Sequence, residues 1–258
     1  MNIAIVGAGN MGSAIVAGLM NLKKDNLTVL VSNPSSQKLD AIKLQFPSVQ
    51  TTGNNIDCVK NADIIVLAVK PYVLPLVAEE IKPLLKQKVI ISVVAGVVID
   101  QLIEIFGDNN EYFYVIPNTA ISTGHGMTFV TSKNTTERSN QFVKEIFDTM
   151  GTTAFIEERL MGAATALSSC GIAYAFKYIQ ACVQAGVELG FKPSDAQKYA
   201  VATVSGAMSL LEKVDTTPQL EIDKVTTPGG MTIKGINKLE ETGFVSSIIA
   251  SIKEPLKK

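Results

Sequence analysis

The sequence predicts a doubly wound α/β domain followed by an all-α domain. Up to about residue 156, short runs of Val, Ile and Leu alternate with longer stretches that carry helical periodicity. Runs this short and this apolar are typical of strands covered on both faces, as in a parallel sheet with crossover helices. From residue 158 onward the strand signals stop and only helical patterns follow. We therefore expect one domain over residues 1–157 and a second over residues 158–258.

The individual elements follow from these patterns. Seven apolar runs are expected to form strands: NIAIVG, LTVLVS, DIIVLAV, KVIISVV, YFYVI, GMTFV and TTAFI. In the second domain, helices are predicted over 158–190, 194–213, 230–242 and 244–256. The breaks between them are predicted at Gly190, Pro193, Pro218 and Gly243.

The longest apolar stretch, from Met161 to Val187, has the length of a membrane span. Lys177, Gln180 and Gln184 lie inside it at helical spacing, so a core or interface helix is the better prediction. A bundle of about a hundred residues has too few helices to cover a helix that is apolar around most of its circumference. We therefore expect a second copy of the chain to cover it, in a homodimer or a higher homo-oligomer.

Charge and cysteine content narrow the classes of partner and compartment. The chain has 23 basic and 24 acidic residues without a basic stripe, which argues against nucleic acid as a partner. The first ten residues read as a buried strand and not as a signal peptide. Three cysteines without C-x-x-C spacing argue against a disulfide framework or a zinc site. We expect a cytoplasmic protein with no membrane partner and no metal.

A glycine-rich turn follows the first predicted strand. Gly7, Gly9 and Gly12 form G-x-G-x-x-G directly before a helix that begins near Asn10. This context places a pyrophosphate on the helix N-terminus: Gly7 allows the tight turn, Gly9 lets the phosphates approach, and Gly12 lets helix and strand pack closely. The first domain is thus expected to be of the Rossmann type. The residues expected to contact the dinucleotide in this turn are Gly7, Gly9, Asn10, Met11 and Gly12.

The end of the second strand indicates which dinucleotide is bound. An acidic residue there would hold the ribose 2′-hydroxyl of NAD. Residues 32–36 read S-N-P-S-S instead and contain no carboxylate. The hydroxyl and amide groups of Ser32 and Asn33 are able to contact a 2′-phosphate that an aspartate would repel. This favours NADP(H), with NAD(H) left open because no arginine is present to clamp a phosphate.

Two further strand ends are expected to border the cofactor, because ligands of an open α/β sheet lie outside the carboxyl ends of its strands. The strand from Asp63 ends in A-V-K-P, and YFYVI is followed by P-N-T. Asn118 would then lie near the nicotinamide, and Lys70 is a candidate catalytic residue. The residues expected at these strand ends are Ala68, Val69, Lys70, Pro71 and Asn118.

Several motifs together resemble one enzyme family. They are G-A-G-N-M-G at 7–12, A-V-K-P at 68–71, P-N-T at 117–119, A-L-S-x-x-G-x-A-Y at 166–174, A-G-V-x-L-G at 185–190 and V-T-T-P-G-G-M-T-I-x-G at 225–235. The set is similar to pyrroline-5-carboxylate reductase from Met1 to about Phe244. The resemblance implies NAD(P)H-dependent reduction of 1-pyrroline-5-carboxylate to L-proline. It also implies a Rossmann domain followed by a helical dimerisation domain, in dimers that often assemble further.

The resemblance gives the second glycine turn, T-T-P-G-G-M-T, a role. In the family its counterpart begins a helix whose backbone N–H groups take the substrate carboxylate, and its last threonine faces the ring nitrogen. Elementary electrostatics agrees, since a helix N-terminus carries roughly half a positive charge and several unpaired donors. Thr232 is the candidate catalytic residue for the nitrogen. The residues expected to bind substrate are Thr227, Gly229, Gly230, Met231, Thr232 and Asn118.

The chain also departs from the family pattern. Tyr114 stands where arginine is common, and residues 168–174 read S-S-C-G-I-A-Y where S-G-S-G-P-A-Y is common. Met231 replaces a threonine of the common G-G-T-T. A reductase of another cyclic imino acid and a non-catalytic NADP-binding regulatory protein are therefore the alternatives. A β-hydroxyacid dehydrogenase is disfavoured, because that family has asparagine four residues after its lysine and here Lys177 is followed by Ala181.

Overall fold

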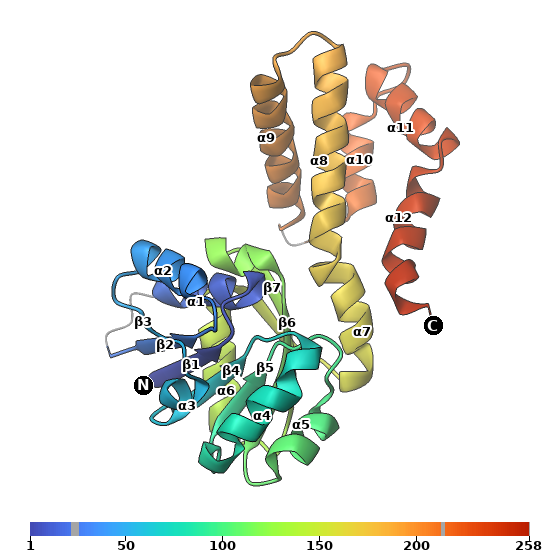
Figure 1. Ribbon diagram of the computed structural model, residues 1–258. Coiled ribbons are helices and arrows are strands. Elements are labelled where there is room, and N and C mark those ends of the chain that lie inside the picture. The colour runs from blue at the N-terminus through green and yellow to red at the C-terminus, as the bar shows by residue number, and fades with distance from the viewer. Residues whose placement is uncertain (22–25, 213–214, 258) are drawn as a thin grey trace. The chain divides into compact units, whose positions relative to one another are not determined.

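The computed structural model describes residues 1–21, 26–212 and 215–257. The chain divides into two compact units, Met1–Ser169 and Cys170–Lys258 (Figure 1). The first unit extends past the domain boundary that the sequence predicts between residues 157 and 158. Each unit is described here by itself.

The first unit is built on an eight-stranded sheet with the order β3-β2-β1-β4-β5-β6-β7-β8. The strands are β1 (Asn2–Val6), β2 (Thr28–Ser32), β3 (Gln50–Thr52), β4 (Ile64–Leu67), β5 (Val89–Ser92), β6 (Glu111–Pro117), β7 (Gly126–Lys133) and β8 (Gly151–Phe155). All seven predicted runs form strands. The short β3 is an addition that the sequence did not signal, because its three residues Q-T-T include no large apolar side chain.

The sheet is parallel from β3 to β6, but β7 runs antiparallel to β6 and β8 runs parallel to β7. The predicted parallel sheet with crossover helices is therefore wrong at the β6–β7 pair. Only residues 118–125 separate β6 from β7, and a parallel crossover needs a dozen residues or more. The chain returns beside β6 through a 3₁₀ turn, Thr119–Thr123, and reverses its direction.

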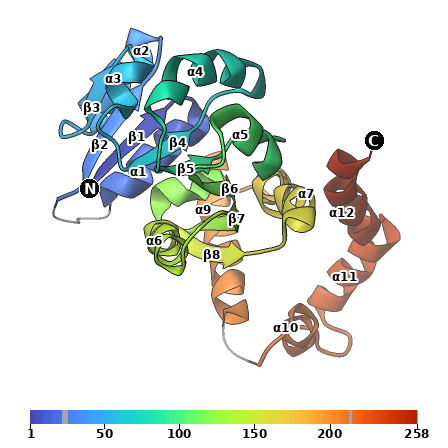
Figure 2. The ribbon, with the colours of Figure 1, turned by 90° about the horizontal axis from the view of Figure 1, so that it is seen from below.

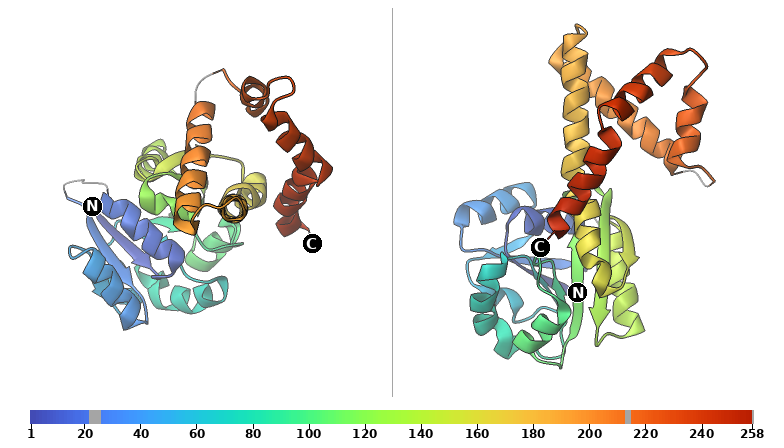
Figure 3. Two further views of the ribbon diagram at one scale, coloured as in Figure 1. Left: turned by 90° about the horizontal axis from the view of Figure 1, so that it is seen from above. Right: turned by 90° about the vertical axis from the view of Figure 1, so that its right-hand side faces the viewer.

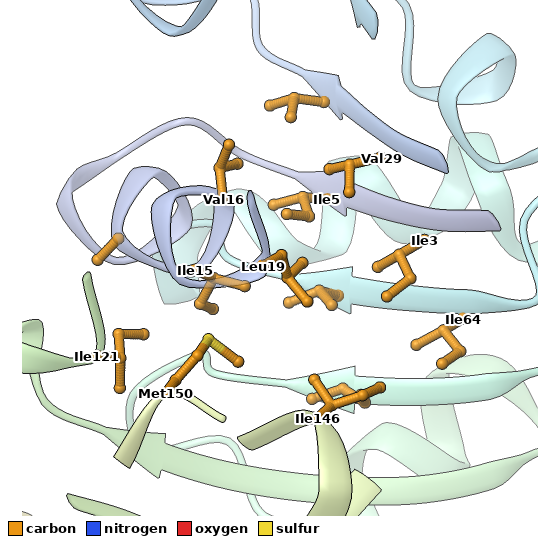
Figure 4. Packing of buried hydrophobic residues seen from close by; sticks show 14 of the residues in the cluster. Ile3, Ile5, Ile15, Val16, Leu19, Val29, Ile64, Ile121, Ile146 and Met150 are labelled. Carbon is orange, nitrogen blue, oxygen red and sulfur yellow. The ribbon is translucent and has the colours of Figure 1, made fainter. Parts of the chain in front are cut away.

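Helices cover both faces of this sheet (Figure 2). One apolar cluster joins the sheet to α1 (Asn10–Asn21), α2 (Ser36–Gln45) and α6 (Glu137–Asp148). The other joins it to α3 (Asn55–Val59), α4 (Leu74–Ile81) and α5 (Ile99–Phe106). In the first cluster Ile15 and Leu19 of α1 lie over Ile5 of β1, with Met150 beside them (Figure 4). Side chains buried on both faces explain why the strands read as continuous apolar runs.

The chain leaves this sheet through a segment of changing helical type. A 3₁₀ turn (Glu158–Leu160), α7 (Met161–Ala164) and a π-helical turn (Thr165–Ser169) precede the long helix α8 (Gly171–Glu188). The single helix expected over 158–190 therefore begins with a 3₁₀ turn and is interrupted by a π-helical turn before α8. Buried Met161 belongs to the second apolar cluster, so the start of this segment is part of the core of the first unit.

The second unit is entirely helical in its described residues, and Figure 3 shows it from two further sides. It comprises α8, α9 (Pro193–Leu211), α10 (Pro218–Val225), α11 (Met231–Glu241) and α12 (Phe244–Lys253). Helix α10 is an addition to the prediction, since Pro218 begins this helix and does not only mark a break. Proline is favoured in the first turn of a helix, where its missing N–H costs nothing. Thr217 caps α10 by accepting a hydrogen bond from the Leu220 N–H group.

The two units differ in burial. In the first unit the two clusters bury most of the strand residues, whereas Ala196 alone is buried among the described residues of the second unit. Large side chains such as Phe176, Leu189 and Val225 are more than half exposed there. None of the described helices is long and apolar enough to cross a membrane.

Candidate active site

The first glycine turn is shaped by close packing. Gly7 has a φ of +108°, and a Cβ on it would lie 2.6 Å from the carbonyl oxygen of Ala68. A Cβ on Gly12 would lie 2.0 Å from the Gly7 carbonyl oxygen. Side chains at these two positions are therefore incompatible with the packing of β1, α1 and the end of β4.

Gly9 is different, because a Cβ built on it meets no atom within 4 Å. The space over Gly9 is open, and the first N–H groups of α1 are without intrahelical partners. Asn10 is exposed and Met11 is half-buried at this helix start. No acidic side chain lies in the first turn of α1. An open glycine at the N-terminus of a buried helix is what a diphosphate needs, so the donor set fits a dinucleotide.

The end of β2 supports the same turn. The Gly7 N–H group donates to the carbonyl of Ser32 at 2.9 Å, and the Ala8 N–H group donates to Asn33 Oδ1 at 3.2 Å. Ser32 is fully buried and its hydroxyl donates to Asn55 Oδ1 at 2.7 Å. The side chains predicted to contact the adenosine ribose are thus also structural supports of the loop.

Asn55 and Glu80 belong to this hydrogen-bonded group although the sequence analysis did not predict them. Asn55, the first residue of α3, accepts from Ser32 and donates to Glu80 Oε2 on α4 at 2.7 Å. The only available signal was a polar pair, Asn54-Asn55, after a short polar strand. Cys58 of α3 is buried, and burial raises the pKa of its thiol to about 11. Hydrogen bonds to Ser32 and Ile5 lower this pKa, but their effect is smaller than that of burial.

The end of β4 passes under the glycine turn. The Ala68 N–H group donates to the Val6 carbonyl at 2.9 Å. A Cβ built on Gly7 would lie 3.1 Å from Cγ1 of Val69. Lys70 is exposed and precedes the 3₁₀ turn Pro71–Val73. The described hydrogen bonds and ion pairs include none made by the Lys70 ammonium group. Ala68 and Val69 thus lie against the glycine turn, while Lys70 and Pro71 lie at the surface.

Asn118 follows β6 and is nine-tenths buried. Its Oδ1 accepts from the Ala120 N–H group at 3.2 Å, and its Nδ2 donates to Ser168 Oγ at 3.2 Å. Ser168 belongs to the π-helical turn and was not among the predicted site residues. Its position in the A-L-S-x-x-G-x-A-Y motif was the one sequence signal for it.

The second glycine turn lies in the second unit, between α10 and α11. Gly229 has a φ of +71°, which favours glycine, and the Gly230 N–H group donates to the Thr227 carbonyl at 3.0 Å. Gly230 is the N-cap of α11, whose first turn carries no acidic residue. Met231 and Thr232 are exposed at this helix start. The arrangement presents backbone donors to solvent without a competing carboxylate, as an anion site requires.

Possible metal ligands are dispersed in the part of the chain that the structure describes. No group of three or more His, Cys, Asp or Glu side chains is placed there to hold an ion. His125 is exposed, and its Nδ1 lies 2.9 Å from the Thr123 carbonyl oxygen. All three cysteines carry free thiols.

Two family models match the chain. One, described as "Pyrroline-5-carboxylate reductase dimerisation", matches residues 158–258. The other, described as "NADP oxidoreductase coenzyme F420-dependent", matches residues 2–96. The first match supports homo-oligomerisation and the second supports a nicotinamide cofactor.

Solved structures of pyrroline-5-carboxylate reductases resemble this chain over nearly its whole length. A pyrroline carboxylate reductase of Plasmodium falciparum with NADP bound is 29% identical, with a TM-score of 0.89 over 99% of this chain and 95% of that one. A pyrroline-5-carboxylate reductase of Coxiella burnetii is 31% identical, with a TM-score of 0.87 over 98% and 95%. An imine reductase of Streptomyces aurantiacus shares the fold alone, at 13% identity and a TM-score of 0.56.

Curated relatives extend the agreement over the full length. The pyrroline-5-carboxylate reductase of Aquifex aeolicus is 34% identical over 100% of this chain and 96% of its own length. That of Escherichia coli is 32% identical over 99% and 96%. This chain spans about half of pyrroline-5-carboxylate reductase 1 of Dictyostelium discoideum, at 48% of its length. With both glycine turns intact, the chain belongs to the pyrroline-5-carboxylate reductase family and is an oxidoreductase.

Proposed function

We propose that this chain reduces 1-pyrroline-5-carboxylate to L-proline with NADPH as the preferred hydride donor, the last step of proline biosynthesis. Reduction of this substrate is the reaction of the family to which the chain belongs. The observation that carries the proposal is the second glycine turn at the start of α11, a second anion site that a pure dinucleotide-binding protein has no use for.

The first unit supplies the cofactor site in this proposal. When bound, the nicotinamide supplies a hydride from its C4 atom. The N–H groups at Asn10, Met11 and Gly12 would hold the diphosphate, with the open face of Gly9 admitting it. The preference for NADPH is supported by the absence of a carboxylate in residues 32–36.

The second unit supplies the substrate contacts. The N–H groups that open α11 would hold the substrate carboxylate, with Gly229 and Gly230 leaving room for it and Thr227 assisting. Thr232 would accept a hydrogen bond from the ring N–H of the iminium. Reduction of the C=N bond would send its π electrons to nitrogen, which would keep the proton that Thr232 faces. The iminium form needs no general base, so Lys70 would act only by its positive charge.

We further propose that the protein is a cytoplasmic homodimer in which the domains are residues 1–157 and 158–258. The exposed apolar side chains of α8 to α12 support the dimer, because a unit that buries so little needs another surface. Free thiols at all three cysteines are typical of a reducing compartment.

The test is oxidation of NADPH and, separately, NADH while racemic pyrroline-5-carboxylate is titrated at neutral pH. Saturable oxidation with proline as product is expected, with the higher kcat/KM for NADPH. A six-membered cyclic imino acid with a higher kcat/KM would favour the alternative reductase. NADPH binding without turnover of either imine would favour the regulatory protein.

A further inference from the structure

The orientation of the Asn118 amide follows from its neighbours. A backbone N–H group is only a donor, so the atom that faces the Ala120 N–H must be Oδ1. Nδ2 then faces Ser168 and donates one hydrogen to its Oγ. The second Nδ2 hydrogen has no acceptor in the hydrogen bonds of the described residues. This donor is held in one orientation at the carboxyl end of β6.

The π-helical turn is what brings Ser168 to this strand end. Thr165–Ser169 packs on β6, fifty residues away in sequence from Asn118. A π turn adds one residue to a helical turn, is rare, and frequently lies at a functional site. Within it, Ser168 is half-buried, while the hydroxyl of its neighbour Ser169 makes none of the described side-chain hydrogen bonds.

Sheet order indicates which half of the cofactor this donor meets. β1 separates β2 and β3 on one side from β4, β5 and β6 on the other. A dinucleotide lies across the strand ends with its diphosphate at the β1–α1 turn. Ser32 and Asn33 end β2 on the adenosine side, so Asn118 at the end of β6 lies on the nicotinamide side.

We propose that Ser168 is a positioning residue that fixes the Asn118 amide so that its free N–H group donates to the nicotinamide half of the cofactor. This inference rests on the cofactor part of the proposed function. The amide without Ser168 keeps its bond to Ala120 but loses the partner that fixes Nδ2. Ser168 acts through Asn118 and contacts no reacting atom.

The experiment measures binding of NADPH and of adenosine 2′,5′-bisphosphate, which lacks the nicotinamide half, to the full chain. Ser168→Ala should weaken NADPH binding roughly fivefold, as the loss of one net hydrogen bond does. Binding of the bisphosphate should change less than about twofold, because its contacts lie at the other strand ends. Ser168→Thr, which keeps the hydroxyl, should restore NADPH affinity, and Ser169→Ala is the matched control in the same turn.

A double-mutant cycle with Asn118→Ala separates positioning from a structural role. If Ser168 acts through Asn118, adding Ser168→Ala to Asn118→Ala has no further effect on NADPH binding. Additive losses, equal weakening of both ligands, or a Ser168→Ala variant that matches Ser169→Ala would each overturn the inference. A non-additive cycle in a protein without pyrroline turnover would contradict the proposed function alone, and turnover with an additive cycle would contradict the inference alone.

Discussion

The two glycine turns of this protein use glycine for different reasons. In the first turn Gly7 and Gly12 are required by the protein itself, because a Cβ on either would overlap a backbone oxygen. Gly9 is open, so the packing of the protein does not require it, and in the proposed function the diphosphate does. In the second turn Gly229 is required by its φ of +71°, and the helix start that follows is exposed. Glycines of one motif therefore divide into those that stability needs and those that binding needs.

The largest effect is expected at Gly12. Gly12→Ala should destabilise the protein by about 3 kcal/mol or more, because its Cβ would lie 2.0 Å from the Gly7 carbonyl oxygen and the backbone has to move. Urea unfolding followed by circular dichroism measures this. An unfolding free energy within about 0.5 kcal/mol of the wild type would show that the turn absorbs a side chain.

Gly9→Val is the matching change at the ligand's position. NADPH affinity should fall by more than about a hundredfold, because the side chain fills the space expected to hold the diphosphate. The melting temperature without ligand should stay close to the wild-type value, in contrast to Gly12→Ala. Retained NADPH affinity would mean that the diphosphate lies elsewhere.

In the second turn the expected effect is on turnover and not on the cofactor. Thr232→Ala should lower kcat/KM for pyrroline-5-carboxylate roughly tenfold, as loss of a charge-assisted hydrogen bond does. The Kd for NADPH should not change. Thr242→Ala, at the other end of α11, is the control. An unchanged kcat/KM would remove Thr232 from the mechanism.

The smallest effect is expected at the cysteine beneath the first turn. Cys58 is 2% exposed and its pKa is raised by burial to about 11, so the folded state binds this proton more tightly than the unfolded state. Its contribution to stability is complete below pH 9 and is lost as the pH rises toward 11. Below pH 9 the native Cys58 should therefore resist a thiol reagent. Mass spectrometry of the labelled protein measures this, with the urea-unfolded protein as the reference, and labelling of native Cys58 at the unfolded rate would contradict its burial.

The elements that were predictable from the sequence are those with local signals. Both glycine turns, the seven apolar strands and the helices α9, α11 and α12 can be predicted from periodicity and glycine spacing. The direction of β7 depends on the short connection from β6, which leaves no apolar pattern, and α10 begins at Pro218, a residue type that also marks breaks between helices. Ser168 and Asn55 escaped because each reaches its partner across the fold, from fifty and twenty-three residues away.

If the protein is the proposed homodimer, the low burial of the second unit makes its stability depend on protein concentration. In the proposed homodimer, α8 to α12 bury their apolar side chains only when two chains associate. Dilution favours dissociation and therefore lowers the stability of the fold. The melting temperature should rise with protein concentration, and at low concentration activity should decline at a rate set by subunit exchange. For an enzyme assembled in this way, the amount of chain present regulates catalysis through more than the number of active sites.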